Sequence, residues 1–277
     1  MTDGTNPTPL APTPAEEAAA LRTATLRSRR SFIGLGLAGL AGLAGWRYLL
    51  HTPEADGIPG GLRKVLDFNG HLAGDYFRNT RLAPQFARGR AEMPRANGDV
   101  GLGDDFDLAA WKLTVQGYAP AGTAARAQEF SLADLKALPR TEQTTELKCI
   151  EGWSTVVHWA GVRLADLLAK YPLATRSGQP ADPNHLPADV APYVSMVTPD
   201  ENYYVGLEIW SALHPQTLLC YEMNGQPLTP EHGAPLRLVT PLKYGIKHIK
   251  RIGTIAFTDT RPADYWAELG YDWSAGH

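Results

Sequence analysis

The chain has 277 residues, of which 44% are hydrophobic and 20% are charged, and its formal net charge is -3. This globular composition excludes a disordered tail protein, a collagen-like repeat and a protein with many membrane spans. The first 50 residues hold five Arg against three acidic residues, which leaves 21 Lys and Arg against 26 Asp and Glu in the remainder. A net charge near -5 on that part argues against nucleic-acid binding, which needs a basic face.

The N-terminal segment has the layout of an export address. Residues 1–26 are rich in Ala, Pro and Thr without periodicity, which predicts a disordered lead-in. Two arginines then precede an uncharged run from Phe32 to Gly45, and the order Ser-Arg-Arg-x-Phe within residues 27–50 resembles a bacterial twin-arginine signal. The alternative is a simple membrane anchor whose arginines follow the positive-inside rule. No Ala-x-Ala site follows cleanly, so we expect an uncleaved anchor on a periplasmic protein.

The predicted elements of residues 51–277 are short and mixed. Residues 51–105 are rich in Gly, Pro, Asn and Asp, which predicts irregular backbone. Alternation and capping residues then predict strands over 111–116, 144–149, 193–197, 217–223, 236–239 and 249–257, and helices over 131–137 and 163–170. Short helices among many strands indicate a single α+β domain with a β-rich core.

Two cysteines, Cys149 and Cys220, allow at most one disulfide and exclude a disulfide scaffold. Neither has a CxxC partner or a histidine at zinc spacing, so a zinc site with several protein ligands is not expected. Cys220 lies in an alternating strand and is expected to be a small core residue. Cys149 comes at a strand end, where a thiolate could bind a soft metal or attack a substrate, although a buried structural cysteine is the commoner case.

The three histidines His158, His185 and His214 are scattered, and surface or core positions are expected for each. A cysteine hydrolase would need a general base such as His158 within hydrogen-bond reach of the Cys149 thiol. The sequence has no oxyanion-loop signature, no P-loop, no GxSxG elbow and no dinucleotide-binding loop. A further alternative, which is not an enzyme, is a membrane-tethered binding module that no longer holds a metal.

Two long motifs resemble those of the molybdopterin-dependent oxidoreductases of the sulfite oxidase superfamily. The first reads Cys-Ile-Glu-Gly-Trp-Ser at 149–154 and continues as Trp-Ala-Gly-Val-Arg-Leu at 159–164. The second reads Tyr-Glu-Met-Asn-Gly-Gln-Pro-Leu at 221–228, Glu-His-Gly-Ala-Pro-Leu-Arg-Leu-Val at 231–239 and Lys-Tyr-Gly-Ile-Lys-His-Ile-Lys at 243–250. The resemblance covers about residues 60–275 and implies the mixed, β-rich molybdopterin-binding fold of that superfamily.

The resemblance implies that Cys149 is the protein thiolate ligand of molybdenum, whose other sulfur ligands come from a pterin without an attached nucleotide. It also implies that Arg237 and Lys250 hold the pterin phosphate. The other residues expected to bind the cofactor are Asn79, Thr198, His232, His248 and Ile249. Trp153 and Tyr244 are expected to line the substrate pocket. Twin-arginine export agrees with this assignment, because that route carries proteins already folded around a cytoplasmic cofactor.

The loop after Cys149 distinguishes branches of the superfamily. Sulfite oxidases and assimilatory nitrate reductases continue with arginines, whereas residues 150–154 read Ile-Glu-Gly-Trp-Ser and resemble the catalytic subunits of periplasmic methionine sulfoxide reductases. The resemblance implies oxygen-atom transfer with a neutral S-oxide or N-oxide, and sulfite oxidation is the alternative. The chain has no haem or iron–sulfur motif. A membrane haem protein or a cytochrome is therefore expected as the electron partner.

Overall fold

The structure is a computed structural model that describes residues 13–55, 57–76, 81–103, 106–119 and 123–277, without the side chains of residues 16, 20, 23–24, 26–30 and 73–76. The chain divides into two compact units. The first comprises residues 1–53 and 59–61, and the second comprises residues 54–58 and 62–277.

The first unit is built on one long helix, α1 (Pro14–Leu50). Its segment Ser31–Leu50 is long and apolar enough to cross a membrane, a test that a signal sequence near the N-terminus also passes. The sequence predicted a disordered lead-in through residue 26, but residues 14–26 are helical. Their many Ala, Leu and Glu residues are strong helix formers, which accounts for the difference. Residues 1–12 lie outside the described part of the chain.

The second unit contains two five-stranded sheets. The first sheet, of order β10-β9-β6-β5 with β11 also paired to β9, comprises β5 (Arg140–Lys148), β6 (Ser154–Arg163), β9 (Leu218–Met223), β10 (Gln226–Pro227) and β11 (Arg237–Val239). The second, of order β4-β3-β12-β7-β8, comprises β3 (Leu113–Gln116), β4 (Ala127–Phe130), β7 (Tyr193–Val197), β8 (Tyr204–Glu208) and β12 (Thr254–Thr258). Within each sheet the described strands pair antiparallel, except that β3 and β12 of the second sheet pair parallel. The predicted α+β fold with a β-rich core is confirmed.

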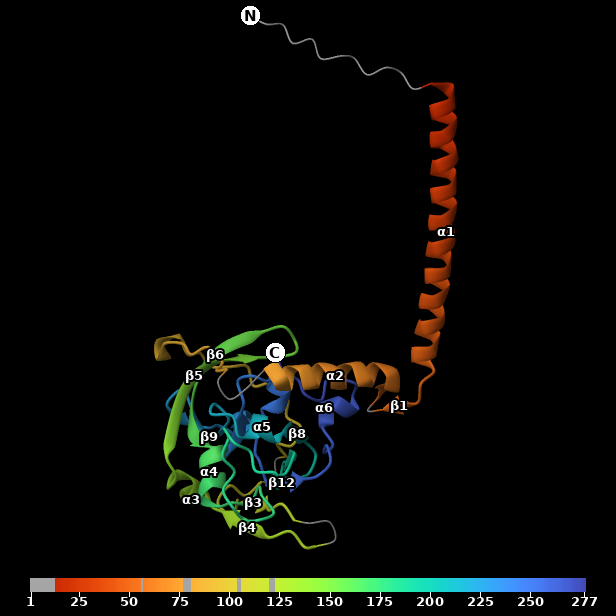
Figure 1. Ribbon diagram of the computed structural model, residues 1–277. Coiled ribbons are helices and arrows are strands. Elements are labelled where there is room, and N and C mark those ends of the chain that lie inside the picture. Colours follow the sequence, from red (N-terminus) through yellow and green to blue (C-terminus); the bar gives the residue numbers. More distant parts are fainter. Residues whose placement is uncertain (1–12, 56, 77–80, 104–105, 120–122) are drawn as a thin grey trace, which may run out of the picture. The chain divides into compact units, whose positions relative to one another are not determined.

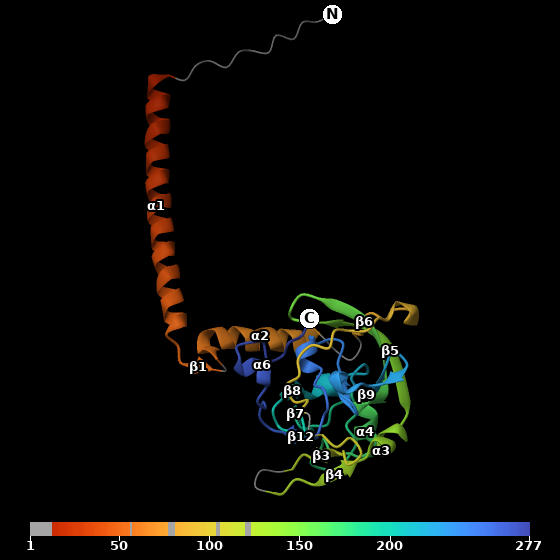
Figure 2. The ribbon, with the colours of Figure 1, turned by 180° about the vertical axis from the view of Figure 1, so that it is seen from behind.

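Short helices and one longer helix connect these strands. They are α2 (Gly60–Tyr76), α3 (Leu132–Lys136), α4 (Leu164–Lys170), α5 (Ile209–Ala212), α6 (Tyr265–Glu268) and the 3-10 turns η1 (Arg88–Arg90), η2 (Pro230–His232) and η3 (Gly245–Lys247). A two-residue pair, β1 (Glu54–Ala55) and β2 (Ile58–Pro59), precedes them. Within the second unit, α2 and α6 lie at the end away from β3 and β4 (Figures 1 and 2).

The main core cluster joins the two sheets and α4. It includes Leu113 of β3, Val162 of β6, Val194 of β7 and Ile255 of β12, all fully buried. The apolar face predicted for the helix at 163–170 is confirmed, because its three leucines are buried against this cluster. The predicted strand alternation and the amphipathic helix therefore meet in one core.

Strand β6 is central to its sheet and was not predicted. It pairs with β5 on one side and with β9 on the other, and its residues from Val157 to Val162 are all buried. A strand covered on both faces shows no alternation of apolar and polar residues, so the pattern search had no signal. At Gly161 the backbone of β9 comes so close that an added Cβ would lie 2.2 Å from the Leu219 carbonyl oxygen.

We expect Gly161→Ala to lower the free energy of unfolding by about 2–3 kcal/mol, because overpacking against backbone cannot be relieved by a side-chain rotation. Gly89→Ala is the matched control, since an added Cβ there meets nothing within 4 Å. Urea unfolding followed by circular dichroism would measure both variants. Equal midpoints for the two variants would contradict the close approach of the strands.

The irregular backbone predicted for residues 51–105 is wrong for α2. This helix is fixed by a tertiary contact that its local sequence does not reveal: the Arg63 guanidinium donates to the carbonyl oxygens of Ala267 at 2.8 Å and Tyr271 at 2.9 Å. From residue 81 to 103 the described backbone is irregular apart from η1, as predicted. The predicted strand 249–257 begins late, at Thr254, because a 3-10 turn and irregular backbone occupy 245–253.

Candidate active site

A cavity of about 320 Å³ opens in the second unit between segments that are far apart in the sequence. Its walls come from the segment before β3, the tip of the β5–β6 hairpin, η2 with the start of β11, η3 with the residues after it, and α6. Six residues that the sequence predicted for the site line it: Cys149, Trp153, His232, Arg237, His248 and Lys250. The fold therefore brings both sequence motifs to one place.

Cys149 lies at the tip of the β5–β6 hairpin. The two strands stay in register up to the pair Lys148 and Ser154, and the Cys149 amide donates to the Trp153 carbonyl at 2.9 Å. Gly152 adopts φ 85°, a left-handed conformation that closes the tip without the steric cost of a side chain. The Cys149 thiol is free and partly exposed, and the Asn97 side-chain amide lies 3.8 Å from its sulfur. The predicted position of this cysteine at a strand end is confirmed.

Arg237, the first residue of β11, is a buried cation without an acidic partner among the described residues. Its Nη1 and Nη2 donate to the carbonyl oxygens of His232 and His248, each at 3.2 Å, and its guanidinium lies 5.0 Å from the centre of the Trp159 ring. Its Nε has no hydrogen-bond partner within the described part of the chain. Burial lowers the pKa of Arg237 to about 10. Such a cation is costly to bury unless an anion binds beside it.

Two neutral histidines lie near this arginine. The His248 Nε2 lies 2.9 Å from the Thr240 carbonyl, which can only accept, so this nitrogen carries the proton. His248 Nδ1 is therefore an acceptor, and it is buried without a partner among the residues that the structure describes. Burial, followed by the charge of Arg237, lowers the pKa of His248 to about 3 and also lowers the pKa of His232. Both rings offer hydrogen bonds without adding charge to the cavity.

Lys250 supplies a second cation to the cavity. Its Nζ donates to the backbone carbonyls of Asn97 and Gly98, both at 2.8 Å. Burial, followed by the charge of Arg237, lowers the pKa of Lys250 to about 8. Two cations that disfavour each other in a partly buried site would both be stabilised by an anion bound next to them.

Sequence reasoning missed an arginine that reaches the cavity from the segment before β3. The Arg95 guanidinium lies 5.7 Å from the centre of the Trp153 ring, and the Trp153 indole donates to the Glu151 carboxylate at 3.0 Å. The hydrogen bond from Trp153 holds the pKa of Glu151 below its usual range. The loop 150–154 contains no arginine, as its sequence shows, but the fold supplies one from elsewhere. Only contacts between distant segments could have revealed it.

Tyr244 does not line this cavity. It borders a neighbouring open hollow of about 490 Å³, together with Cys149 and Trp153. Its ring packs edge-on against His277, with the ring centres 4.9 Å apart. Another hollow, of about 710 Å³, shares Gly98 with the cavity but contains no cysteine. The cavity and the hollow beside Tyr244 both border Cys149.

Two of the predicted cofactor residues, Thr198 and Ile249, do not appear in the cavity wall. Thr198 is 2% exposed and its hydroxyl donates to the Asp200 carboxylate at 2.6 Å. Ile249 is fully buried in the core, and its carbonyl accepts a hydrogen bond from the Leu238 amide at 2.9 Å. Both fix the backbone rather than face the cavity. Asn79 lies outside the described residues.

The histidine of the hydrolase alternative is not placed at Cys149. His158 lies within the β5–β6 ladder, where its Nδ1 is 2.8 Å from the Thr144 hydroxyl, and it does not line the cavity. His214 is buried and bonded to a backbone carbonyl, and His185 is exposed. The geometry gives no support to a thiol–histidine pair between Cys149 and His158.

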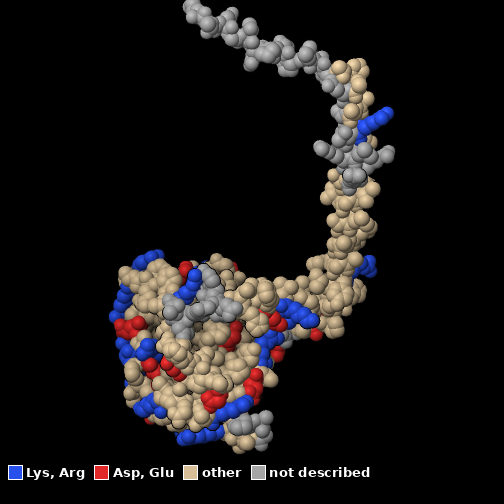
Figure 3. Space-filling view, in the orientation of Figure 1, with Lys and Arg blue, Asp and Glu red and all other residues tan. Residues whose placement is uncertain are grey.

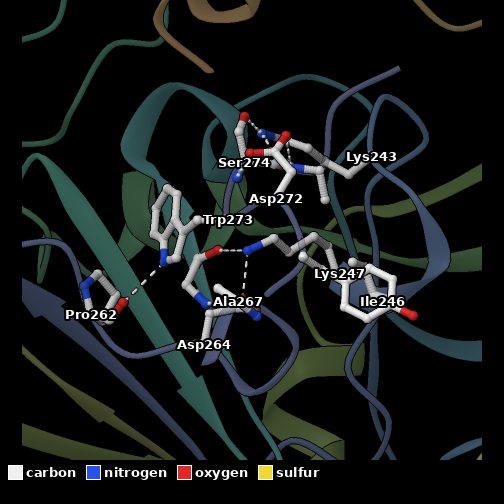
Figure 4. Close-up of polar contacts among 12 residues, drawn as sticks. Lys243, Ile246, Lys247, Pro262, Asp264, Ala267, Asp272, Trp273 and Ser274 are labelled. Atoms are coloured by element: carbon white, nitrogen blue, oxygen red, sulfur yellow. Dashed lines mark hydrogen bonds and ion pairs between the residues drawn. The ribbon is translucent and has the colours of Figure 1, made fainter. Parts of the chain in front are cut away.

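Lys247 of η3 and Lys243, just before it, differ from the cations of the cavity because each forms an ion pair with a carboxylate. Figure 4 shows both lysines. Lys247 is fully buried and its Nζ lies 2.5 Å from the Asp264 carboxylate and 2.8 Å from the Gly206 carbonyl. Lys243 donates to the Ser274 carbonyl at 2.8 Å and to a glutamate of β8 at 2.9 Å. These two lysines hold segments that follow them in the chain, and the cations in the cavity wall are instead Arg95, Arg237 and Lys250.

The donor set fits an anionic cofactor that brings its own metal. Within the described residues, no group of three or more His, Cys, Asp or Glu side chains could hold a metal ion. A metal bound by Cys149 would therefore need further ligands from a cofactor. The unpartnered Nε of Arg237 and Nδ1 of His248, with the cation of Lys250 nearby, suit a phosphate and a nitrogen-rich ring.

A partly exposed thiol and a buried arginine without an ion-pair partner among the described residues line one cavity, an arrangement that suits an anionic cofactor and a metal that a thiolate can bind. The family described as oxidoreductase molybdopterin binding domain matches residues 100–266. The chain belongs to this family, and it is a molybdopterin-binding oxidoreductase of the sulfite oxidase family.

Several known proteins are similar to this chain. A putative protein-methionine-sulfoxide reductase subunit YedZ1 of Azospira oryzae is 30% identical over 91% of this chain and 88% of that protein. The protein-methionine-sulfoxide reductase catalytic subunit MsrP of Xanthomonas campestris is 37% identical, and the match covers 58% of this chain and about half (49%) of that protein. The sulfane dehydrogenase SoxCD of Paracoccus pantotrophus is a similar solved structure, with a TM-score of 0.46, 17% identity, and coverage of 66% of this chain and 46% of that chain.

Proposed function

We propose that this oxidoreductase reduces methionine sulfoxide or a related S-oxide or N-oxide at a molybdenum centre bound by Cys149. The observation that carries the proposal is the shared cavity, which joins the Cys149 thiol to the buried and unpaired Arg237. The names of the relatives, which are methionine sulfoxide reductase subunits, support the substrate class. Residues 51–277 would form the catalytic domain.

The residues present would hold the cofactor in distinct ways. Cys149 would bind molybdenum, and Arg237 and Lys250 would hold the terminal phosphate of a pterin without an attached nucleotide. His248 would accept a hydrogen bond at Nδ1, which is neutral and unpartnered. When bound, this cofactor supplies two-electron oxygen-atom transfer.

The mouth of the cavity would position the substrate. The Trp153 ring offers an apolar surface to the carbon substituents of an S-oxide. Arg95, above that ring, would donate a hydrogen bond to the negatively polarised oxygen of the S–O group. Sulfite oxidation is the second candidate, because Arg95 is also a cation that an oxyanion could use. The carboxylate of Glu151 beside Trp153 favours the neutral S-oxide.

The N-terminal helix would place the enzyme at the outer face of the inner membrane. Residues Ser31–Leu50 have the length and composition of a membrane span, and the sequence before them resembles a twin-arginine export signal. Reduction of an S-oxide consumes two electrons and two protons and releases water. A membrane haem protein would supply the electrons to the periplasmic enzyme.

The reaction is tested with the purified full-length holoenzyme and reduced viologen dye. We expect dye oxidation with methionine sulfoxide, and slower oxidation in Arg95→Ala by about tenfold, the value of one charge-assisted hydrogen bond. Arg90→Ala is the matched control, because Arg90 is exposed on η1 and does not line the cavity. Turnover of sulfite with an acceptor far above that of every S-oxide and N-oxide would contradict the proposed reaction.

The binding of an anion by Lys250 should depend on pH. The pKa of its ammonium is about 8, so the group is charged below this pH and neutral above it. We expect sulfate, whose charge is constant in this range, to bind the cofactor-free protein up to about tenfold more weakly at about pH 9 than at about pH 7. Thermal shift against sulfate concentration measures this change.

Two variants separate Lys250 from other titrating groups. Lys250→Arg should bind sulfate almost equally at both pH values, because arginine stays charged. Lys250→Met should bind weakly at both. A pH dependence that is the same in Lys250→Met as in the unaltered protein would assign the effect to another group.

A further inference from the structure

Helix α2 carries an apolar stripe on the face opposite its contacts with the rest of the second unit. Val65, Phe68 and Leu72 are spaced by three and four residues, so they share one face of the helix. Their exposed fractions are 54%, 60% and 51%. The face of a surface helix that points to solvent is normally polar, so this stripe calls for a covering partner.

The attachment of α2 fixes the direction in which the stripe faces. Arg63 is 2% exposed, and its guanidinium donates hydrogen bonds to the carbonyl of Ala267 in α6 and to that of Tyr271 after α6. Gly70 approaches Ser274 so closely that an added Cβ would lie 3.2 Å from the serine Cβ. Asp67 pairs with Arg261 on the same side. The helix therefore cannot rotate to bury the stripe without breaking these contacts.

The residues beside the stripe suit a lipid surface. Lys64 and His71 lie along one border and are exposed, and Asn69 lies along the other. An apolar stripe flanked by basic and polar side chains is typical of helices that lie in the membrane interface. In Figure 3 the upper edge of the surface over α2 is tan, without Lys, Arg, Asp or Glu.

The chain itself keeps α2 close to any membrane that holds the candidate span. The span ends at Leu50 and α2 begins at Gly60, and ten residues of extended chain reach at most about 35 Å. We infer that the stripe of Val65, Phe68 and Leu72 rests in the lipid interface. This inference depends on the proposal that Ser31–Leu50 remains as an anchor, and it does not depend on the identity of the substrate.

Contact with lipid would also set the orientation of the active site. The α6 residues Tyr265 and Trp266 line the cavity, and α6 is bonded to α2 through Arg63 and Ala267. A helix seated on the bilayer would therefore hold the cavity at a fixed height above it. An electron donor embedded in the same membrane would meet the enzyme in one orientation.

Photocrosslinking tests the inference with the full-length holoenzyme in vesicles of phosphatidylcholine and phosphatidylglycerol. The photoreactive residue p-benzoylphenylalanine replaces Phe68 in one sample and Leu186 in a control. Leu186 is an exposed leucine in the loop between α4 and β7. After irradiation, mass spectrometry of the peptide containing the probe is expected to show lipid adducts at position 68 at least tenfold above those at position 186.

Each outcome of the crosslinking identifies what contacts the stripe of α2. No lipid adduct at position 68, or equal adducts at both positions, would overturn the inference. Crosslinks from position 68 to a second copy of the chain would show a protein interface instead. Protein that fails to float with the vesicles would contradict the anchor as well as the inference. Loss of methionine sulfoxide reduction with lipid adducts intact would refute only the proposed function.

Discussion

Cys149→Ser is expected to reduce oxygen-atom transfer by at least about 100-fold, since even the outer partners of metal ligands are worth 10–100-fold. A serine hydroxyl is a harder and weaker donor to molybdenum than a thiolate. The protein should remain folded with pterin bound, because position 149 is a partly exposed hairpin tip rather than a core position. Viologen oxidation, metal analysis and circular dichroism measure the three properties.

Cys220→Ala is the matched control for this change. Cys220 is fully buried in β9, and burial raises the pKa of its thiol to about 12, so it is a neutral core residue, as its alternating strand predicted. We expect its replacement to cost about 1 kcal/mol of stability and to leave metal content and activity unchanged. Full activity in Cys149→Ser would remove this cysteine from the metal site.

Arg237→Ala is expected to yield protein with about tenfold less molybdenum per chain. The variant removes the buried guanidinium that would bind the cofactor phosphate, and one charge-assisted hydrogen bond of this kind is worth about 1.5–3 kcal/mol. It also leaves the carbonyls of His232 and His248 without their present donor. Metal analysis of the purified protein gives the loading, and thermal unfolding reports the structural cost separately.

The control for the arginine is one whose charge is already paired. Arg140 is partly exposed and bonded to Glu142 and Glu222, so Arg140→Ala should keep full metal loading. Arg237→Lys retains the charge and should recover part of the loading. Normal loading in Arg237→Ala would show that the phosphate is held elsewhere.

Local pattern was enough for elements that have one face in the core and one in solvent. The strand at 193–197 coincides with β7, and the Ser131 cap predicted the start of α3, because each depends on neighbouring residues alone. Strand β6 and helix α2 were not predicted, for two different reasons. The strand is buried on both faces, and the helix is held by the distant contact of Arg63.

The site shows the same division. The two motifs predicted Cys149 and Arg237, since each lies in a contiguous run of the sequence, and both line the cavity. Arg95 and Asn97 come from irregular backbone that follows no period, so only the folded chain places them beside Cys149. The motif also included Ile249, whose side chain faces the core. A motif identifies a backbone segment before it identifies which side chains face the ligand.

The face on which the Cys149 thiol lies depends on whether the number of residues in the preceding strand is changed by an odd or an even number. β5 and β6 pair without a shift from Arg140 opposite Val162 to Lys148 opposite Ser154. Side chains along a strand alternate between faces, so one residue inserted or deleted within this ladder would reverse the face of every position beyond it. An insertion or deletion of two residues would restore the original face. The metal content of such length variants would therefore alternate between odd and even changes, and elemental analysis would become a measure of strand register.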